Sequence, residues 1–142
     1  MLRKHETKAY PIGENMPPHV DWSLKELEKE TDFLGWGVWF VIEAKTNQVV
    51  GDIGFKGKPN VQGIVEVGYG ILSVAQNKGY ATEAMEALCE WAFQTGRVKQ
   101  ILADCLVDNL PSIKVLEKLG MKQIGLNDNL LLWELRRQEN EE

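Results

Sequence analysis

The segment Gln76–Ala81 has the composition of an anion-binding turn between a strand and a helix. A helix N-terminus offers unpaired backbone N–H groups and the positive end of the helix dipole. Gly79 lets the backbone approach a bulky anion, Ala81 keeps the next turn uncrowded, and Lys78 adds positive charge. The spacing matches neither a Walker loop nor a three-glycine dinucleotide fingerprint. The residues alone therefore predict either a phosphate cradle or an ordinary strand–helix turn that uses glycine for its geometry.

Other residues that commonly carry chemistry are sparse. The only histidines, His5 and His19, lie in an irregular N-terminal segment, and we interpret them as solvated loop residues. No His–Cys spacing suits a zinc ion, so we expect no metal. Cys89 and Cys105 fall on a predicted helix and a predicted strand, where packing is favoured over reactivity.

The elements that position the cradle follow from hydrophobic period and turn residues. Prolines keep residues 1–20 irregular, and a capping box at Ser23–Glu26 opens a short helix to about Glu30. Trp22, Trp36 and Trp39 precede or begin the sheet, and a core role is favoured over an acceptor wall. We expect strands at 38–42, 49–55, 64–71, 98–106, shortly before Gly125 and at 130–135, and further helices at 79–95 and 109–119.

This order predicts an α+β fold with a mixed, twisted sheet and helices on both faces. The step from strand 64–71 through helix 79–95 to strand 98–106 is the one expected parallel crossover. No repeat or linker interrupts the chain, so we expect a single domain over 1–142, with an irregular segment at 1–20 and a frayed tail at 137–142.

Composition narrows the class of protein. The 142 residues are 44% hydrophobic and include ordinary amounts of glycine and proline, which excludes disorder for most of the chain. No apolar run approaches the ~20 residues of a membrane span, and no signal peptide is expected. A net charge of -5 argues against nucleic acid or anionic lipid as a partner and mildly favours a cationic substrate. Two cysteines fit a reduced, cytoplasmic setting.

The order Gln76-x-x-Gly79-x-Ala81 resembles the acyl-CoA pyrophosphate loop of the GNAT-type N-acetyltransferase superfamily. Its flanks, Glu66–Tyr69 and Tyr80–Ala84, are similar to the Rim-type branch, which acetylates protein N-termini and other amines. Asn109–Ser112 and Leu116–Met121 are similar to the second signature of that branch. The resemblance spans about residues 36–135 in family order and spacing.

The resemblance implies a site for acetyl-CoA as co-substrate. The family's fourth and fifth strands, here 64–71 and 98–106, are expected to splay into a V-shaped opening, with a bulge near Gly70 and Ile71. The resemblance assigns the pyrophosphate cradle to Gln76, Asn77, Lys78, Gly79, Tyr80 and Ala81. It assigns the strand backbone that pairs with pantetheine to Ile71, Leu72 and Ser73, and the side chain that contacts the pantetheine arm to Asn109. Asn109 also suits a helix N-cap.

Glu66 is the predicted general base. It shares a strand face with Gly68 and Gly70, which leaves space beside it. A protonated amine cannot attack a thioester, and a carboxylate that is buried or works through water could remove its proton. The alternative is a solvent-facing strand residue.

The proton donor to the leaving thiolate is less defined in the sequence. Many relatives place a tyrosine where this chain has Leu116. Ser112 is the nearest hydroxyl in the signature and is the predicted donor, although a simple first-turn helix hydroxyl is an alternative. Tyr69 is a weaker option.

The N-terminal region departs from the family, which opens with a strand and a helix. That first strand is expected to be shortened or missing, rebuilt from residues 5–10, or supplied by a partner chain. A missing strand would expose an edge of the sheet, and a second copy of the chain could cover that edge, so a homodimer is one possible arrangement.

The sequence thus predicts an acetyl-CoA-dependent N-acetyltransferase. It would move an acetyl group to a primary amine by direct attack in a ternary complex, without a metal. The acceptor would be a small amine or a protein N-terminus. The alternative is a noncatalytic acyl-CoA-binding or sensor module of the same fold.

Overall fold

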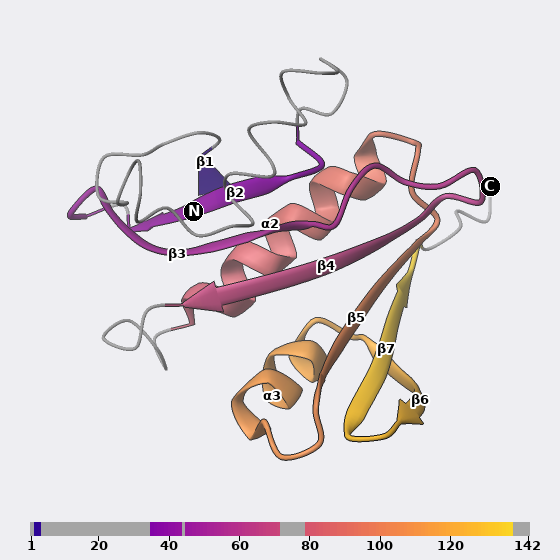
Figure 1. Cartoon of the computed structure of the whole chain (residues 1–142). Coiled ribbons are helices and arrows are strands. Elements are labelled where there is room, and N and C mark those ends of the chain that lie inside the picture. Colours follow the sequence, from indigo (N-terminus) through magenta and orange to yellow (C-terminus); the bar gives the residue numbers. More distant parts are fainter. Residues whose placement is uncertain (1, 4–34, 44, 72–78, 138–142) are drawn as a thin grey trace, which may run out of the picture.

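The computed structural model describes residues 2–3, 35–43, 45–71 and 79–137, and the predicted helix at 23–30 lies outside these ranges. The described part forms one seven-stranded mixed sheet with two helices, in the spatial order β1-β2-β3-β4-β5-β7-β6 (Figure 1). The predicted α+β fold and its element order from residue 38 onward are confirmed for this part of the chain. The sequence predicts helices on both faces of the sheet, whereas both described helices belong to one core on one face. Gly125, expected just after a strand, lies within β6 (Lys122–Asn127).

Strands β2 (Val38–Glu43), β3 (Gln48–Phe55) and β4 (Ile64–Ile71) form an antiparallel meander. β2 contains a continuous run of β-branched and aromatic residues, buried from Trp39 to Ile42, which is the pattern of a strand covered on both faces. Asn47 adopts a left-handed backbone (φ 60°) and its N–H donates to the Glu43 carbonyl, which closes the β2–β3 turn. Pairing of β4 with β3 stays in register from Val67 to Ile71, so the bulge expected near Gly70 and Ile71 is absent from the described part of β4.

The predicted opening lies between β4 and β5 (Gln100–Leu106). These parallel strands pair only at Ile64–Gln100, Val65–Ile101 and Glu66–Leu102. Beyond that point β4 continues against β3, whereas β5 pairs along its whole length with β7 (Leu130–Arg136). Figure 1 shows the two strands running apart on either side of a V, as the sequence predicts.

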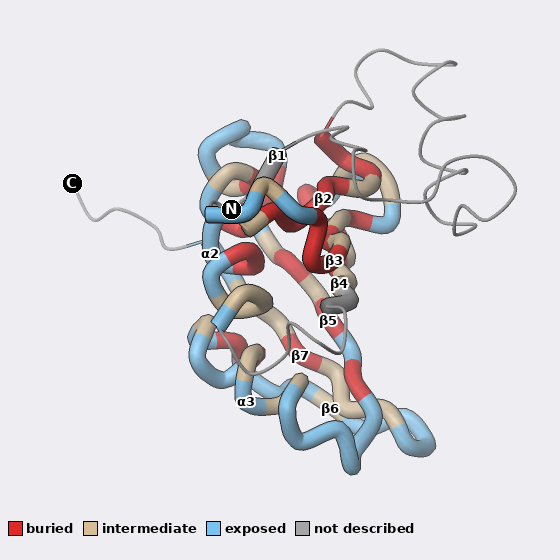
Figure 2. The backbone as a smooth tube through the Cα atoms, turned by 90° about the vertical axis from the view of Figure 1, so that its left-hand side faces the viewer, coloured by how far each residue is buried: buried red, intermediate tan, exposed pale blue. Residues whose placement is uncertain are grey.

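The main core lies between the sheet and one helical layer. Helix α2 (Tyr80–Gln94) buries Ala84, Met85, Leu88 and Ala92 against the sheet, and Leu116 of α3 (Leu110–Lys118) belongs to the same cluster. Figure 2 shows buried residues concentrated where the central strands meet α2, whereas edge strand β6 is largely exposed. Both described helices therefore pack against the sheet in one continuous hydrophobic core.

The tryptophans before and within β2 belong to this core. Trp36 and Trp39 are 2% and 7% exposed, and their rings contact Trp91 of α2 with centroid separations of 4.8 and 5.4 Å. The indole N–H of Trp39 donates to the Gly35 carbonyl at 2.8 Å. The favoured interpretation of these two residues as core is confirmed.

The N-terminal strand is short and lies in an unexpected place. Residues Leu2–Arg3 form β1, which pairs antiparallel with Val41 and Phe40 of β2 at the edge of the sheet. Residues 5–10, one predicted source of the first strand, lie outside the described residues. This pairing is therefore made by a segment of the chain itself.

Gly54 and Gly68 face each other across β3 and β4 and provide a matched pair for mutation. A Cβ at Gly54 would lie 2.2 Å from the Gly37 carbonyl oxygen, whereas at Gly68 its nearest neighbour is the Lys56 side chain at 3.9 Å. We predict that Gly54→Ala lowers the free energy of unfolding by about 1–3 kcal/mol through overpacking. Gly68→Ala should leave it nearly unchanged. Urea unfolding of both variants tests this, and equal stabilities would contradict it.

Candidate active site

The predicted cradle is described from Gly79 onward, because residues 72–78 lie outside the described ranges and with them Leu72, Ser73, Gln76, Asn77 and Lys78. Gly79 is the N-cap of α2 and adopts a left-handed backbone (φ 83°), which favours glycine. The cap has no side-chain hydrogen bond to the first turn of the helix. Because the first N–H groups of a helix have no partner within it, this turn can receive an anion. Ala81 lies in that first turn, whereas the described end of the strand, Ile71, pairs with Gly51 of β3.

Tyr80 connects this helix start to the β2–β3 hairpin. Its hydroxyl donates to the Glu43 carboxylate at the end of β2, and this hydrogen bond, with a smaller contribution from burial, raises the pKa of Tyr80 above its usual value. The same carboxylate accepts a hydrogen bond from Thr46 at 2.7 Å. The tyrosine ring also packs on the main core. The Tyr80 side chain therefore links the first turn of α2 to the end of β2.

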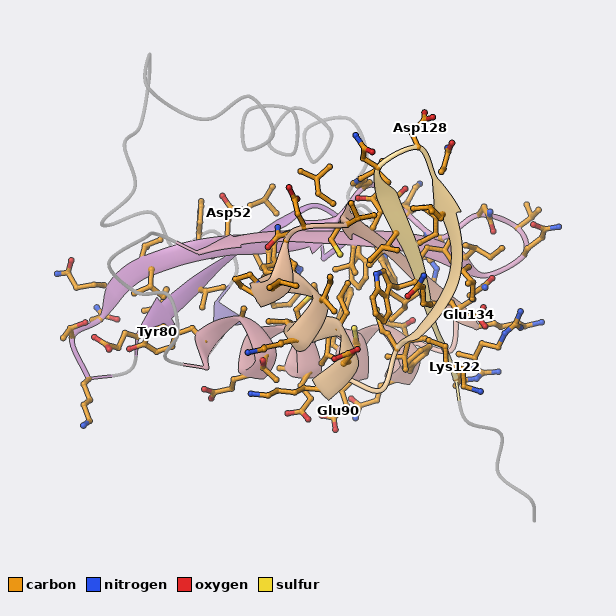
Figure 3. All side chains as sticks on the ribbon, turned by 90° about the horizontal axis from the view of Figure 1, so that it is seen from below. Asp52, Tyr80, Glu90, Lys122, Asp128 and Glu134 are labelled. Atoms are coloured by element: carbon orange, nitrogen blue, oxygen red, sulfur yellow. The ribbon has the colours of Figure 1, made fainter. Side chains whose placement is uncertain are left out.

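Alternation along β4 divides its side chains between the two faces of the sheet. Val65 and Val67 are buried toward the helices, so Glu66 and Gly68 project from the opposite face. Asp52, which pairs with Gly70, shares that second face and points away from α2 in Figure 3. Glu66 is thus placed at the last β4–β5 pair, on the face away from the main core.

Glu66 forms an ion pair at this position. Its Oε2 accepts a hydrogen bond from Lys56 Nζ at 2.9 Å, and the two side chains are 40% and 57% exposed, respectively. The Lys56 stem passes close to Gly68, whose missing side chain leaves it room. The carboxylate is therefore held by a cation in partial contact with solvent, rather than buried among apolar groups as one version of the base hypothesis required.

Ser112 lies at the start of α3 and is fixed by two hydrogen bonds. Its N–H donates to the Asn109 side chain at 3.2 Å, so Asn109 is the N-cap of α3, as its second predicted role required. Its hydroxyl oxygen accepts a hydrogen bond from the Tyr69 hydroxyl at 2.8 Å. Tyr69 comes from β4 and reaches across the opening to α3. Burial raises the pKa of Tyr69, and the hydrogen bond to Ser112 partly offsets the increase.

The two predicted catalytic side chains, Glu66 and Ser112, therefore lie on opposite faces of the sheet. Glu66 projects from the face with Gly68, whereas Tyr69, which meets Ser112, packs on the main core. Leu116 is 1% exposed in that core. Sequence reasoning weighed Tyr69 only as a weak option and missed Lys56. The lysine directly after β3 could have been found by pairing β3 with β4 and asking which residue meets Glu66.

Both cysteines are buried. Burial raises the pKa of the Cys89 thiol to about 12 and also raises the pKa of Cys105. Both thiols are therefore protonated near neutral pH, which makes them poor nucleophiles.

Across the described ranges, no group of three or more His, Cys, Asp and Glu side chains is arranged to hold a metal ion. No helix there is both long and apolar enough to cross a membrane.

An opening between two parallel strands, beside a helix start that has no side-chain cap, is the arrangement expected of the GNAT fold. Comparison with known families agrees. Residues 2–122 match the family model described as an acetyltransferase (GNAT) domain. The chain belongs to this family, which confirms the expectation from its motifs.

Individual relatives support the same assignment. The chain is 37% identical over 94 residues to the uncharacterized N-acetyltransferase YjdG of Bacillus subtilis, covering 66% of this chain and 56% of that protein. It spans about half the length of the curated relatives it matches.

Solved structures share the fold. The ribosomal-protein-S5-alanine acetyltransferase of Vibrio fischeri superposes with a TM-score of 0.68 at 23% identity, over 81% of this chain and 67% of that one. The microcin C7 self-immunity acetyltransferase MccE, in complex with acetyl-CoA and AMP, gives 0.68 at 17% identity, over 83% and 68%. The fold is thus shared with a Rim-type enzyme, the branch that the motifs suggested.

The buried cysteines give a prediction at pH 8. With the pKa of Cys89 near 12, its thiolate fraction should be about a thousandfold below that of a thiol with the ordinary value of 9.0. Both thiols should therefore react very slowly with an aromatic disulfide reagent in the native protein. In guanidinium chloride both should react at once, because unfolding restores the ordinary pKa. Fast reaction of either thiol in the native protein would contradict their described burial.

Proposed function

We propose that this protein is an acetyl-CoA-dependent N-acetyltransferase that transfers the acetyl group to a primary amine by direct attack within a ternary complex. The observation that carries the proposal is the end of β4–β5 pairing at Glu66 and Leu102, which opens the sheet beside the start of α2, where the N-cap provides no side-chain hydrogen bond. Family membership and the acetyl-CoA complex of MccE support the donor.

The donor would bind along the backbone of this opening. Amides of Gln76–Ala81 would hold the CoA pyrophosphate, with the positive end of the α2 dipole behind them. Pantetheine would pair with the backbone of residues 71–73, beyond the last β4–β5 pair. Asn109 would contact the pantetheine arm through the hydrogen-bonding groups of its side chain that the cap of α3 does not use.

The reaction needs two proton transfers around a carbonyl. Glu66, directly or through water, would take the proton of the acceptor amine, and the neutral amine would attack the thioester. Collapse of the tetrahedral intermediate breaks the C–S bond, and Ser112 would protonate the CoA thiolate. The donated hydrogen bond from Tyr69 favours this role, because a hydroxyl that accepts a hydrogen bond becomes a better donor itself.

The acceptor class in this proposal is a small amine or a protein N-terminus. The name of the Vibrio fischeri enzyme, an S5-alanine acetyltransferase, supports the second option. A cytoplasmic location fits the two free cysteines. A homodimer is retained as part of the proposal because β6 forms one outer edge of the sheet and exposes Ile124 and Leu126.

Donor binding is tested by calorimetric titration with CoA. We predict micromolar binding by the wild-type protein and its loss in Gly79→Glu, because a carboxylate at the cradle repels the pyrophosphate. Gly96→Glu is the matched control: Gly96 is exposed, has a φ of 78° and no atom within 4 Å of an added Cβ, as at Gly79, but follows the other end of α2. Normal binding by Gly79→Glu would contradict the placement of the cradle.

Turnover separates the enzyme from a noncatalytic CoA-binding module. CoA release that depends on an added amine, across a panel of amines and N-terminal peptides, supports the enzyme. Tight CoA binding without release would support the module instead.

The base assignment predicts the behaviour of Glu66→Gln. This variant keeps size and a hydrogen-bonding side chain but cannot take the proton, so the chemical step should slow by about 10²–10⁴. CoA affinity should hardly change. The rate must be measured in a single turnover, since slow product release would hide the loss. Glu90→Gln, on the face of α2 away from the sheet in Figure 3, is the control, and wild-type rates in both variants would remove Glu66 from the mechanism.

A further inference from the structure

Lys56 occupies the place that an acceptor amine must occupy on the proposed base. Its Nζ lies 2.9 Å from Glu66 Oε2, within the reach that a general base needs to remove a proton. The backbones are joined as well, since the Lys56 N–H donates to the Glu66 carbonyl at 2.9 Å. Lys56 is thus a primary amine of the chain itself, held on the proposed catalytic carboxylate.

The position of this pair in the sheet matters. Glu66 belongs to the last β4–β5 pair, and the next residue on its face is Gly68. A Cβ at Gly68 would have the Lys56 Cε as its nearest neighbour, at 3.9 Å, so the lysine stem passes over this glycine. The stem therefore runs over the part of β4 where the opening begins. Transfer to Lys56 requires the thioester of bound acetyl-CoA to reach this point.

We propose that Lys56 is a site of self-acetylation, in which the protein transfers the acetyl group of bound acetyl-CoA to its own Nζ. This inference rests on the proposed function, because it uses the same donor and the same base. Glu66 takes a proton from the Lys56 ammonium, and the neutral amine attacks the thioester carbonyl. The new N–C bond forms as the C–S bond breaks, and the thiolate takes up a proton. The products are Nε-acetyl-Lys56, CoA and one proton released to solvent.

The energetics of the ion pair allow this step. Lys56 is 57% exposed, and a partly exposed ion pair contributes little net free energy, so the Lys56 side chain can leave the carboxylate readily. Acetylation removes the charge and breaks the ion pair. The Glu66 carboxylate then becomes available to an external amine, so one acetylation per chain precedes steady turnover.

The test is to incubate the full chain with acetyl-CoA and no added amine, and to follow CoA release, intact mass and peptide masses. We expect a burst of one CoA per chain and one acetyl group on Lys56. The rate should exceed that at exposed lysines such as Lys99 and Lys114 by at least about tenfold, because a positioned amine reacts as an intramolecular group. The rate per chain should be independent of protein concentration.

Variants separate this reaction from background labelling. Lys56→Arg should abolish the burst, Glu66→Gln should slow it by about 10²–10⁴, and Lys114→Arg should leave it unchanged. An excess of CoA should suppress labelling of Lys56 while labelling of Lys114 continues. Acetyl phosphate, which lacks the CoA moiety, should label exposed lysines without preference for Lys56.

The outcomes distinguish the inference from the proposed function. Acetyl-CoA binding and amine turnover with an unmodified Lys56, or equal labelling of all exposed lysines, would overturn self-acetylation alone. A titration without acetyl-CoA binding would overturn both.

Discussion

The short pairing between β4 and β5 is the constraint on which the candidate site depends. Parallel strands normally continue side by side, but here three residue pairs are followed by divergence. The Gly63 carbonyl accepts N–H groups of Lys99 and Gln100 at 2.7 and 3.1 Å, which fixes the apex of the V. Each arm pairs with an antiparallel neighbour, β3 for β4 and β7 for β5. Because backbone polar groups need partners, the inner edges of the arms are suited to a ligand that brings its own amides, as pantetheine does.

Different functional groups lie beside the opening on the two faces of the sheet. On the core side, Tyr69 crosses from β4 to Ser112 and provides hydroxyl groups in a partly buried setting. On the other side, Glu66 and Lys56 provide a carboxylate and an amine beside a glycine. A single strand supplies residues to both faces because its side chains alternate. This separation suits acyl transfer, in which one proton leaves the nucleophile and another reaches the leaving group.

Much of this arrangement could be predicted from local sequence, and the rest depended on pairing between distant segments. Helix α2 was predicted within one residue at each end, since Gly79 and Gly96 flank a clear helical period. The cap at Asn109 and the proline after it located α3 in the same way. The Lys56–Glu66 ion pair and the Tyr69–Ser112 hydrogen bond join residues 10 and 43 positions apart, and no local pattern encodes such contacts. The two-residue strand β1 is too short to leave a periodic signal.

Position 116 holds a leucine in an apolar environment, and the phenol that contacts Ser112 comes from β4. Leu116 fills the core between α3 and the sheet, and at 1% exposure it leaves no solvent path for a hydroxyl at that position. Ser112 lies four residues earlier, one turn toward the start of α3 and on the same helix face. A serine is too short to reach far into the opening, but Tyr69 brings a phenol to it from the opposite arm. In this chain the strand carries the phenol of Tyr69, and α3 contributes the smaller hydroxyl of Ser112. The proton would then pass along a hydrogen-bonded pair that spans the opening, so its supply depends on the distance between the two arms as well as on α3.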